Sequence, residues 1–398
     1  MSKTKFEGFL KGKSESRASK VKTKFYRKKW FFFVIIPICL FLIVGGFLAF
    51  KTGFVLSKIS TSDESGLRSF FNMLPVIGKN EDIKGEADGR INILLLGYRG
   101  KNMPGGDLLT DTIMLLSYKP QENKVAIISI PRDLFVKIPQ RPNGVKINAV
   151  YSIGEGEGNG KGLEEAKKIV GEVSGLSVHY AVTMNFEGFR NLIDTLGGVE
   201  VFLDSPFYET SQFVQGQECG VEFTLPAGVN KLDGETALCY ARARENTSDF
   251  DRARRQQVII KALKDKLISA GTLTDFGKIN GILNVVGDNV KTDFASHEMR
   301  KFYEKYSQIK DAQIFQRVFE NSEEGKLKVP DDRPEWAGYI LIPRAGWDNY
   351  SDIHQVCQNI FEIESQSNIN PVKQYVRPSS KQTNEEDEIE KKAKKKKE

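Results

Sequence analysis

The chain has 398 residues, of which 40% are hydrophobic and 28% are charged, a balance that suits a globular protein with a sizeable core. Its formal net charge of +6 is concentrated at the two ends, where lysine and arginine dominate 1–29 and lysines fill Lys391–Lys397. Because the middle of the chain is close to neutral, the charge does not predict nucleic-acid binding.

An uncharged segment, Trp30–Phe50, follows the basic residues. About 20 such residues, rising about 1.5 Å each, cross the roughly 30 Å hydrocarbon core of a bilayer. The positive charge on its N-terminal side predicts a single-pass protein of the cell membrane, with 1–29 as a basic cytoplasmic tail and the rest extracellular. A cleaved signal peptide is the alternative, but the segment is long for one and no small-residue cleavage site follows it.

Beyond a polar stretch, 51–89, that we interpret as an extracellular stalk, predicted strands alternate with predicted helices. Short apolar runs bounded by turn residues predict strands, and apolar residues at helical spacing predict helices. The predicted strands are Ile91–Leu96, Thr112–Tyr118, Lys124–Ile130, Tyr180–Met184 and Gly198–Leu203, and the predicted helices are Leu163–Val173, Phe186–Leu196 and Arg252–Ser269. The alternation predicts an α/β or α+β sandwich around a central sheet over 90–365. The charged end, 366–398, is predicted to be disordered.

Four cysteines constrain the chain only weakly. Cys39 lies in the apolar segment, whereas Cys219, Cys239 and Cys357 would be extracellular, where disulfides persist. Three cysteines form at most one intramolecular disulfide, and the sequence does not fix which two are joined, although Cys219 and Cys239 would close the shorter loop. Buried free thiols are the alternative.

The catalytic motifs of several enzyme classes are missing from the sequence. The chain has three histidines, and it contains neither an H-E-x-x-H motif nor paired cysteines at zinc-site spacing. It also lacks a G-x-S-x-G nucleophile elbow. These absences argue against zinc chemistry and against hydrolysis by a catalytic triad.

Arginines gather instead near the ends of predicted elements. Arg242 and Arg244 share one face if their segment is extended, and Arg252 and Arg255 share a helical face beside Gln256. The second pair lies at a helix N-terminus, where free backbone N–H groups favour an anion. Guanidinium groups bind phosphate oxygens in bidentate fashion. The pattern therefore predicts a polyphosphate site, most simply a diphosphate site.

Two further cations belong to the same hypothesis: Arg132, just beyond a predicted strand, and Lys146. The alternative is a solvated basic surface in which arginines pair with Glu245, Asp249 and Asp251, because such pairs are common and contribute only about 0–1 kcal/mol each. The use of arginine rather than lysine, and its position at element ends, argue for the binding site.

A carboxylate for a metal ion lies just before the second predicted strand. Asp111 at the mouth of that strand is suited to Mg²⁺, which takes one or two carboxylates together with phosphate oxygens and water. The alternative for a lone aspartate in this position is a turn or a cap.

The order of these motifs resembles the LytR–CpsA–Psr family of cell-wall phosphotransferases, over roughly 90–365. The matching segments are Asn92–Gly97, Leu109–Leu115, Ser129–Asp133, Lys146–Tyr151, Asp194–Val201, Leu232–Leu238, Tyr240–Arg244 and Asp249–Gln257. The resemblance implies a three-layer α/β/α sandwich with a mixed central sheet. It also implies transfer of a phosphoglycosyl polymer, teichoic acid-like or capsular, from a polyprenyl-pyrophosphate carrier to a hydroxyl of peptidoglycan.

The resemblance assigns roles to individual residues. It implies catalytic roles for Asp111 and Arg132, and it implies a diphosphate site made of Arg132, Lys146, Arg242, Arg244, Arg252, Arg255 and Gln256. Asp249 is a further catalytic candidate, either to accept the proton of the acceptor hydroxyl or to orient Arg242 and Arg244. One of the family's two metal-linked aspartates matches Asp111, with Mg²⁺ or Mn²⁺ as the implied ion.

Two positions depart from the family's pattern. Arg99 stands where the other metal-linked aspartate belongs, and Leu109 replaces an arginine. Asp107 is the candidate substitute ligand, and Asp111 alone with more water is the alternative. Two other functions stay open on the sequence: a non-catalytic scaffold that binds polyprenyl phosphates or anionic glycans, and a pyrophosphatase that uses water as the nucleophile.

Overall fold

A mixed six-stranded sheet forms the centre of the protein in a computed structural model that describes residues 82–100, 108–210, 222–269, 289–306 and 312–362, with residues 282 and 287. In spatial order its strands are β11 (Val290–Thr292), β6 (Tyr180–Asn185), β1 (Ile91–Tyr98), β2 (Thr110–Lys119), β3 (Lys124–Ser129) and β12 (Gln313–Val318). Strand β2 runs antiparallel to β1 and β3, and β11 runs antiparallel to β6. The β1–β6 and β3–β12 pairs are parallel.

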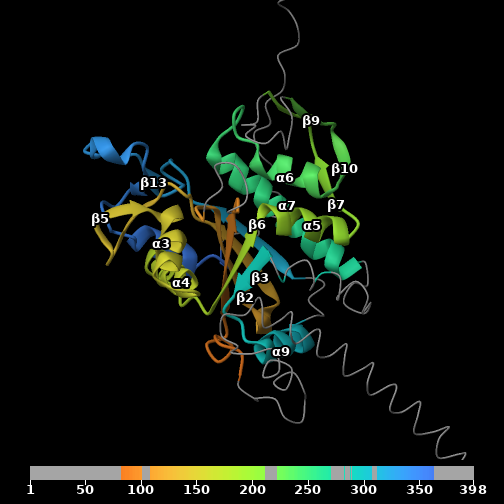
Figure 1. The fold of residues 1–398 in the computed structure, drawn as a ribbon, viewed down its shortest axis with the longest axis horizontal. Helices are drawn as coiled ribbons and strands as arrows, with labels where there is room; N and C mark the ends of the chain where they lie inside the picture. The colour runs from red at the N-terminus through yellow and green to blue at the C-terminus, as the bar shows by residue number, and fades with distance from the viewer. Residues whose placement is uncertain are drawn as a thin grey trace, which may run out of the picture. The chain divides into compact units, whose positions relative to one another are not determined.

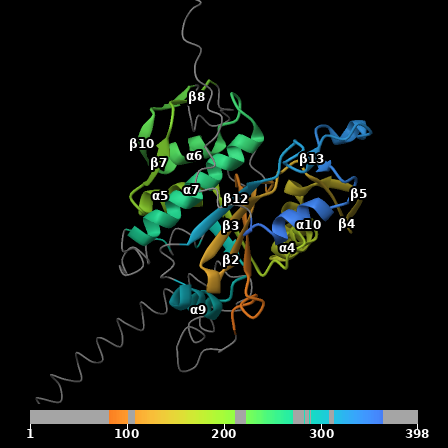
Figure 2. The same cartoon turned by 180° about the vertical axis from the view of Figure 1, so that it is seen from behind.

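Helices flank the sheet on both faces, and the two opposite views agree on this arrangement (Figures 1 and 2). On one side lie α3 (Val150–Glu157), α4 (Lys161–Ser174) and α10 (Ser351–Gln358), and on the other lie α5 (Phe186–Thr195), α6 (Gly234–Arg242) and α7 (Asp249–Ser269). Helix α9 (Ser296–Tyr306) lies at one end of the sheet (Figure 1). This is the mixed central sheet with flanking helices that the sequence predicts.

Small two-stranded sheets and single-turn helices lie outside the central sheet. The pairs are β4 (Phe135–Ile138) with β5 (Arg141–Lys146), β7 (Val199–Leu203) with β10 (Gly228–Leu232), β8 (Phe207–Glu209) with β9 (Phe223–Leu225), and β13 (Leu327–Lys328) with β14 (Ile342–Pro343). The short helices are η1 (Pro120–Glu122), η2 (Ile147–Ala149) and η3 (Glu335–Ala337).

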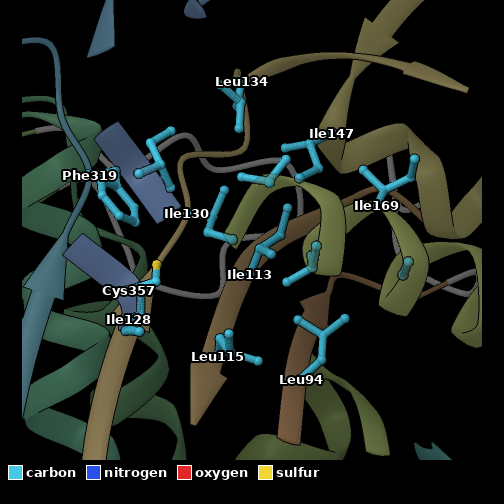
Figure 3. Packing of buried hydrophobic residues seen from close by; sticks show 14 of the residues in the cluster. Leu94, Ile113, Leu115, Ile128, Ile130, Leu134, Ile147, Ile169, Phe319 and Cys357 are labelled. Atoms are coloured by element: carbon cyan, nitrogen blue, oxygen red, sulfur yellow. The ribbon is translucent and has the colours of Figure 1, made fainter. Parts of the chain in front are cut away.

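The two faces of the central sheet are packed differently, and this difference creates the space for a ligand. Leu94, Leu115 and Ile128 are fully buried and pack with Ile169 of α4 and with Phe319 (Figure 3). Strand β1 alternates between buried and half-buried residues, as expected when only one face of a strand is tightly covered. The opposite face of the sheet therefore meets α5, α6 and α7 across a less tightly filled layer.

The helices beside this face have clear local signals. Asn185 caps α5, since its side-chain oxygen accepts a hydrogen bond from Gly188 N at 2.8 Å, and Asp233 caps α6 by accepting from Thr236 N at 2.8 Å. Ser248 and Asp251 form a reciprocal cap for α7, in which Asp251 N donates to Ser248 Oγ at 3.0 Å and Ser248 N donates to Asp251 Oδ2 at 3.2 Å. Each cap satisfies backbone N–H groups that the first helical turn leaves unpaired.

The predicted strands and helices are confirmed with small shifts at their ends, the largest being α7, which begins at Asp249 rather than Arg252. Cys239 is disulfide-bonded to a cysteine outside the described residues, whereas Cys357 is free and buried. None of the described helices is long and apolar enough to cross a bilayer. The predicted spanning segment Trp30–Phe50, the tails 1–29 and 366–398, and most of the stalk lie outside the described residues.

Candidate active site

A cavity of about 100 Å³ opens where β1, β2 and β3 approach α6 and α7. Five guanidinium groups line it, from Arg99, Arg132, Arg242, Arg244 and Arg252, against the two carboxylates of Asp111 and Glu245. This excess of positive charge, carried by groups that bind oxyanions in bidentate fashion, suits a ligand with several negative charges.

Asp111 and Arg132 meet because of the register between two strands. Met114 of β2 pairs with Ser129 of β3, and continuing this antiparallel register places Asp111 opposite Arg132. Arg132 NH1 donates to Asp111 Oδ1 at 2.7 Å, and its Nε lies 3.6 Å from Asp249 Oδ1 and 3.7 Å from Asp133 Oδ2. Burial opposes the charge of Arg132, but the surrounding carboxylates outweigh it, so its pKa is raised. Arg132 is thus held as a cation at the cavity wall.

The first turn of α7 is tied to the same strand. Arg252 is buried, its NH2 lies 2.8 Å from Asp249 Oδ1, and the same nitrogen donates to the backbone oxygen of Asp111 at 3.2 Å. Burial lowers the pKa of Arg252, and Asp249 opposes that effect. Asp249 therefore lies between Arg132 and Arg252 and orients both guanidinium groups toward the cavity.

Arg242 and Arg244 reach the cavity from the end of a helix, so the prediction that their segment is extended is wrong. Asp233 starts α6 and the helix continues to Arg242, where Ala243 leaves the helical conformation with ψ of 133°. The guanidinium of Arg242 lies over the ring of Phe186, 4.8 Å from its centroid, a favourable cation–π distance. Both arginines nevertheless line the cavity, as the sequence predicts.

Arg255 does not line the cavity, which corrects its predicted role in binding the diphosphate. Its side chain is completely buried and points to the end of α6 rather than into the cavity. Nε donates to Tyr240 O at 3.1 Å, and NH2 donates to Ala243 O and to Thr247 Oγ1. Burial lowers the pKa of Arg255 to about 10, which still leaves it charged at neutral pH. Arg255 holds the segment that carries Arg244 and is a positioning residue.

A second cavity, of about 200 Å³, adjoins the first and is almost entirely apolar. Leu95, Met114 and Val182 line it from the sheet, and Phe189, Leu238 and Ile259 line it from α5, α6 and α7. Thr112, Phe186, Arg242 and Gln256 line both cavities. The combined space therefore has a cationic head and an apolar body, which matches an amphipathic ligand with an anionic end.

Comparison with known proteins identifies the family. A model of the LytR_cpsA_psr family matches residues 62–328. The chain belongs to the LytR–CpsA–Psr family. A relative from Oceanobacillus iheyensis, named polyisoprenyl-teichoic acid–peptidoglycan teichoic acid transferase TagU, is 33% identical over 292 residues, which cover 71% of this chain and 82% of the relative. A protein with the same name from Bacillus cereus is 26% identical and is covered over 94% of its length.

Solved structures of this family share the fold. The crystal structure of TagV from B. subtilis is 26% identical to the chain and superposes with a TM-score of 0.52, covering 69% of this chain and 97% of that one. A structure of TagT superposes with a TM-score of 0.51 at 20% identity.

Two other residues expected from the family pattern lie away from the cavity or outside the described residues. Lys146 ends β5, and its Nζ donates to Asp133 Oδ1 at 2.7 Å, but it does not line the cavity. Asp107 lies outside the described residues. Lys146 therefore acts on the site through Asp133, which itself lies beside Arg132.

The residues present can hold Mg²⁺ only together with oxygen ligands from a bound substrate. Among the described residues, no three histidine, cysteine, aspartate or glutamate side chains are grouped to hold a metal ion. Asp111 is 32% exposed at the cavity wall, so its carboxylate can reach an ion there. Because Mg²⁺ accepts one or two carboxylates plus phosphate oxygens and water, Asp111 fits as a protein ligand that depends on the substrate's phosphates.

Sequence reasoning missed two residues that shape the site. Phe186, which supports Arg242, follows Asn185 at the start of α5 and looks like an ordinary core position. Gln257 is buried and its Nε2 donates to Ser129 Oγ at 2.8 Å and to Arg317 O at 3.0 Å, so it fixes α7 against β3 and β12. A glutamine among apolar residues of a helix is the one signal that marks it.

Proposed function

We propose that this protein transfers a phosphoglycosyl polymer, teichoic acid-like or capsular, from a polyprenyl-pyrophosphate carrier to a hydroxyl of peptidoglycan. The relatives from Oceanobacillus iheyensis and Bacillus cereus are named as transferases of teichoic acid to peptidoglycan. One observation in this chain carries the proposal: the arginine-lined cavity and the apolar cavity lie side by side and share the lining residues Thr112, Phe186, Arg242 and Gln256. A polyprenyl diphosphate has the same two parts, a charged head and a long hydrocarbon tail.

The diphosphate is placed by guanidinium groups from three directions. Arg132 lies just after β3, Arg242 and Arg244 come from the end of α6, and Arg252 comes from α7. The tail lies between the sheet and α5, α6 and α7, where burial of hydrocarbon gives about 25 cal/mol per Å². Gln256, which lines both cavities, marks the boundary between head and tail.

The reaction exchanges a phosphoanhydride oxygen for a phosphate ester oxygen. The acceptor hydroxyl attacks the glycan-side phosphorus, a P–O bond forms to the acceptor, the bond to the bridging oxygen breaks, and polyprenyl phosphate leaves with the proton of the acceptor hydroxyl. The arginines neutralise the equatorial and leaving oxygens, which is the main contribution that a protein makes to phosphoryl transfer. Asp249 orients Arg132 and Arg252 rather than abstracting the proton, because both guanidinium groups already surround its Oδ1.

Mg²⁺ or Mn²⁺ is part of the proposal, with Asp111 as the residue that would hold it and Asp107 as a second ligand. When bound, the ion would neutralise charge on the phosphate oxygens. Asp111 in addition accepts a hydrogen bond from Arg132 at 2.7 Å, so this residue orients an arginine whether or not an ion is present.

The membrane anchor is a proposal supported by the uncharged segment Trp30–Phe50 and the basic residues before it. An anchor confines the enzyme to the membrane surface that holds its lipid carrier. A membrane-impermeant thiol reagent should label intact cells when a cysteine is placed in the C-terminal tail, and it should leave a Ser14→Cys variant unlabelled. Labelling of Ser14→Cys alone would refute the orientation.

A transfer assay with the full chain tests the function. The protein is incubated in detergent with a labelled polyprenyl-pyrophosphate glycan and purified peptidoglycan. We expect label in the peptidoglycan and an equal amount of polyprenyl phosphate. Free phosphoglycan without transfer would mean a pyrophosphatase, and unchanged substrate would mean a non-catalytic binding scaffold; no observation in this chain favours either one.

A further inference from the structure

Three exposed aromatic side chains lie in the segment between β13 and α10, and we call Trp336, Tyr339 and Trp347 the aromatic platform. They are 66%, 46% and 36% exposed. Two of the chain's three tryptophans are here. Among the described residues six large hydrophobic side chains are exposed, and half of them belong to this surface. A cluster of exposed aromatic rings marks an interaction site more often than a chance arrangement.

The platform is built on a buried ring that holds the tryptophans in place. Phe135 of β4 is 5% exposed, and its centroid lies 6.2 Å from that of Trp336 and 5.7 Å from that of Trp347. Trp347 Nε1 also donates to Asp332 Oδ2 at 3.2 Å. Gly144 makes room for Phe135, because it has φ of +90° and a Cβ there would lie 2.2 Å from the ring. The rings are therefore presented by a packed support.

Backbone hydrogen bonds connect the platform to the arginine cavity. Leu341 N donates to Asp133 O at 2.9 Å, and Phe135 N donates to Leu341 O at 2.8 Å. Asp133 directly follows Arg132 and pairs with Lys146. Burial raises the pKa of Tyr339, with further contributions from the charges of Asp133 and Asp249. Tyr339 lies two residues before Leu341, so the backbone connects it to the segment that carries Arg132.

The platform lies on the side of the sheet opposite to the cavity proposed for the tail. Strands β5 and β13 lie across the sheet from α5, α6 and α7 in both views (Figures 1 and 2). In an in-line displacement the nucleophile enters opposite the leaving group. The leaving group is polyprenyl phosphate, so the platform is on the side from which the acceptor approaches.

The charge around the platform selects among ligands. Residues 331–348 contain the four carboxylates of Asp331, Asp332, Glu335 and Asp348 against two arginines, and Lys137 pairs with Asp348, so the surface is slightly acidic, which disfavours a phosphate-rich polymer. An anionic lipid surface prefers clustered lysine and arginine. A sugar ring instead offers an apolar C–H face for stacking and hydroxyl groups for nearby carboxylates, so a glycan of low charge fits both features.

We propose that the aromatic platform is the subsite for the acceptor glycan, which stacks N-acetylhexosamine rings on Trp336 and Tyr339 and thereby presents a hydroxyl toward Arg132. This inference rests on the proposed function, since it assigns the acceptor of the same reaction. Trp336, the most exposed of the three, contributes the stacking surface, and Trp347 supports it through Phe135.

Two matched variants test the platform: Trp336→Ala, and Phe202→Ala on β7 as the control, because Phe202 is also 62% exposed but is outside the platform. The full chain in detergent is titrated with soluble peptidoglycan glycan strands that lack stem peptides. We expect Trp336→Ala to lower the affinity roughly tenfold, which is about 1.4 kcal/mol, and Trp336→Phe to recover part of it. The KM for the acceptor should rise while the KM for the polyprenyl-linked donor stays unchanged.

Several outcomes would overturn the inference. The glycan would have to bind elsewhere if Trp336→Ala bound it with wild-type affinity, or if Phe202→Ala lost as much affinity. The same would follow if only the KM for the donor rose. It would also follow if Trp336→Ala pelleted less with phosphatidylglycerol vesicles but still bound the glycan normally. The proposed function fails separately. If the wild-type chain binds the glycan strands through Trp336 but gives no transfer product, the glycan subsite is supported and the transferase function is refuted. If Trp336→Ala leaves transfer unaffected, the transferase function is supported and the glycan subsite is refuted.

Discussion

Replacement of Arg255 by leucine separates a positioning residue from a ligand-binding one. The buried guanidinium donates to two backbone carbonyls, of Tyr240 and Ala243, and to Thr247 Oγ1. Hydrogen bonds from a charged donor contribute about 1.5–3 kcal/mol each, and the abandoned carbonyls regain part of this from water. We therefore expect Arg255→Leu to lower the free energy of unfolding by about 3–5 kcal/mol.

Thermal unfolding of the full chain in detergent measures this loss. For a domain of this size, about 2–4 °C is lost per kcal/mol, so the midpoint should fall by roughly 6–20 °C. Arg244→Ala is the matched control, because Arg244 is 40% exposed and should change stability by less than about 0.5 kcal/mol. Unchanged stability of Arg255→Leu, together with a loss of polyprenyl-pyrophosphate affinity equal to that of Arg244→Ala, would place Arg255 on the ligand and refute this assignment.

Three further predictions follow from the site. Arg244→Ala should weaken binding of polyprenyl pyrophosphate by about 1.5–3 kcal/mol in a titration, Arg244→Lys should recover only part, and Arg254→Ala should bind like wild type; equal small losses would indicate a solvated basic surface. Asp111→Ala should abolish transfer while leaving the fold intact, with a slightly lower unfolding midpoint because Arg132 loses a partner, and EDTA should stop transfer by the wild-type chain; activity that persists in EDTA would eliminate the metal. Burial raises the pKa of Glu209 above 4.5, because the folded state favours the neutral carboxyl. The stability that the neutral Glu209 contributes to the fold is therefore present below pH 4.5 and is lost as pH rises through the folded-state pKa. The stability of the wild type relative to Glu209→Gln should therefore fall as pH rises above 4.5, and a constant difference in unfolding midpoints would contradict this.

The strands and helices could be predicted because their signals are local. A short apolar run that ends at Gly97 marks β1, and the buried residues Leu163, Ala166, Ile169 and Val173 recur at helical spacing in α4. The site could be predicted in part for the same reason. Arg132 follows a strand whose register with β2 brings it to Asp111, and antiparallel neighbours of this kind follow from the order of the strands.

Arg242, Arg244 and Arg255 show where local patterns fail. Alternation in Tyr240–Arg244 is typical of a strand, but the cap at Asp233 starts a helix that continues through Arg242. The sequence places Arg252 and Arg255 in one helical turn without showing which faces the sheet. A usable signal was present, because Arg255 lies one turn before Ile259 and two turns before Ala262, and both are buried with the core of α5, α6 and β7.

The measurement that tests the central claim most directly is a crystal structure of this chain with an isoprenoid diphosphate. The account predicts phosphate oxygens within hydrogen-bond distance of Arg132, Arg242 and Arg244, and a tail that lies against Leu95, Met114 and Phe189 between the sheet and the helices. A diphosphate bound elsewhere, or a tail that leaves the apolar cavity empty, would contradict the assignment of the two cavities.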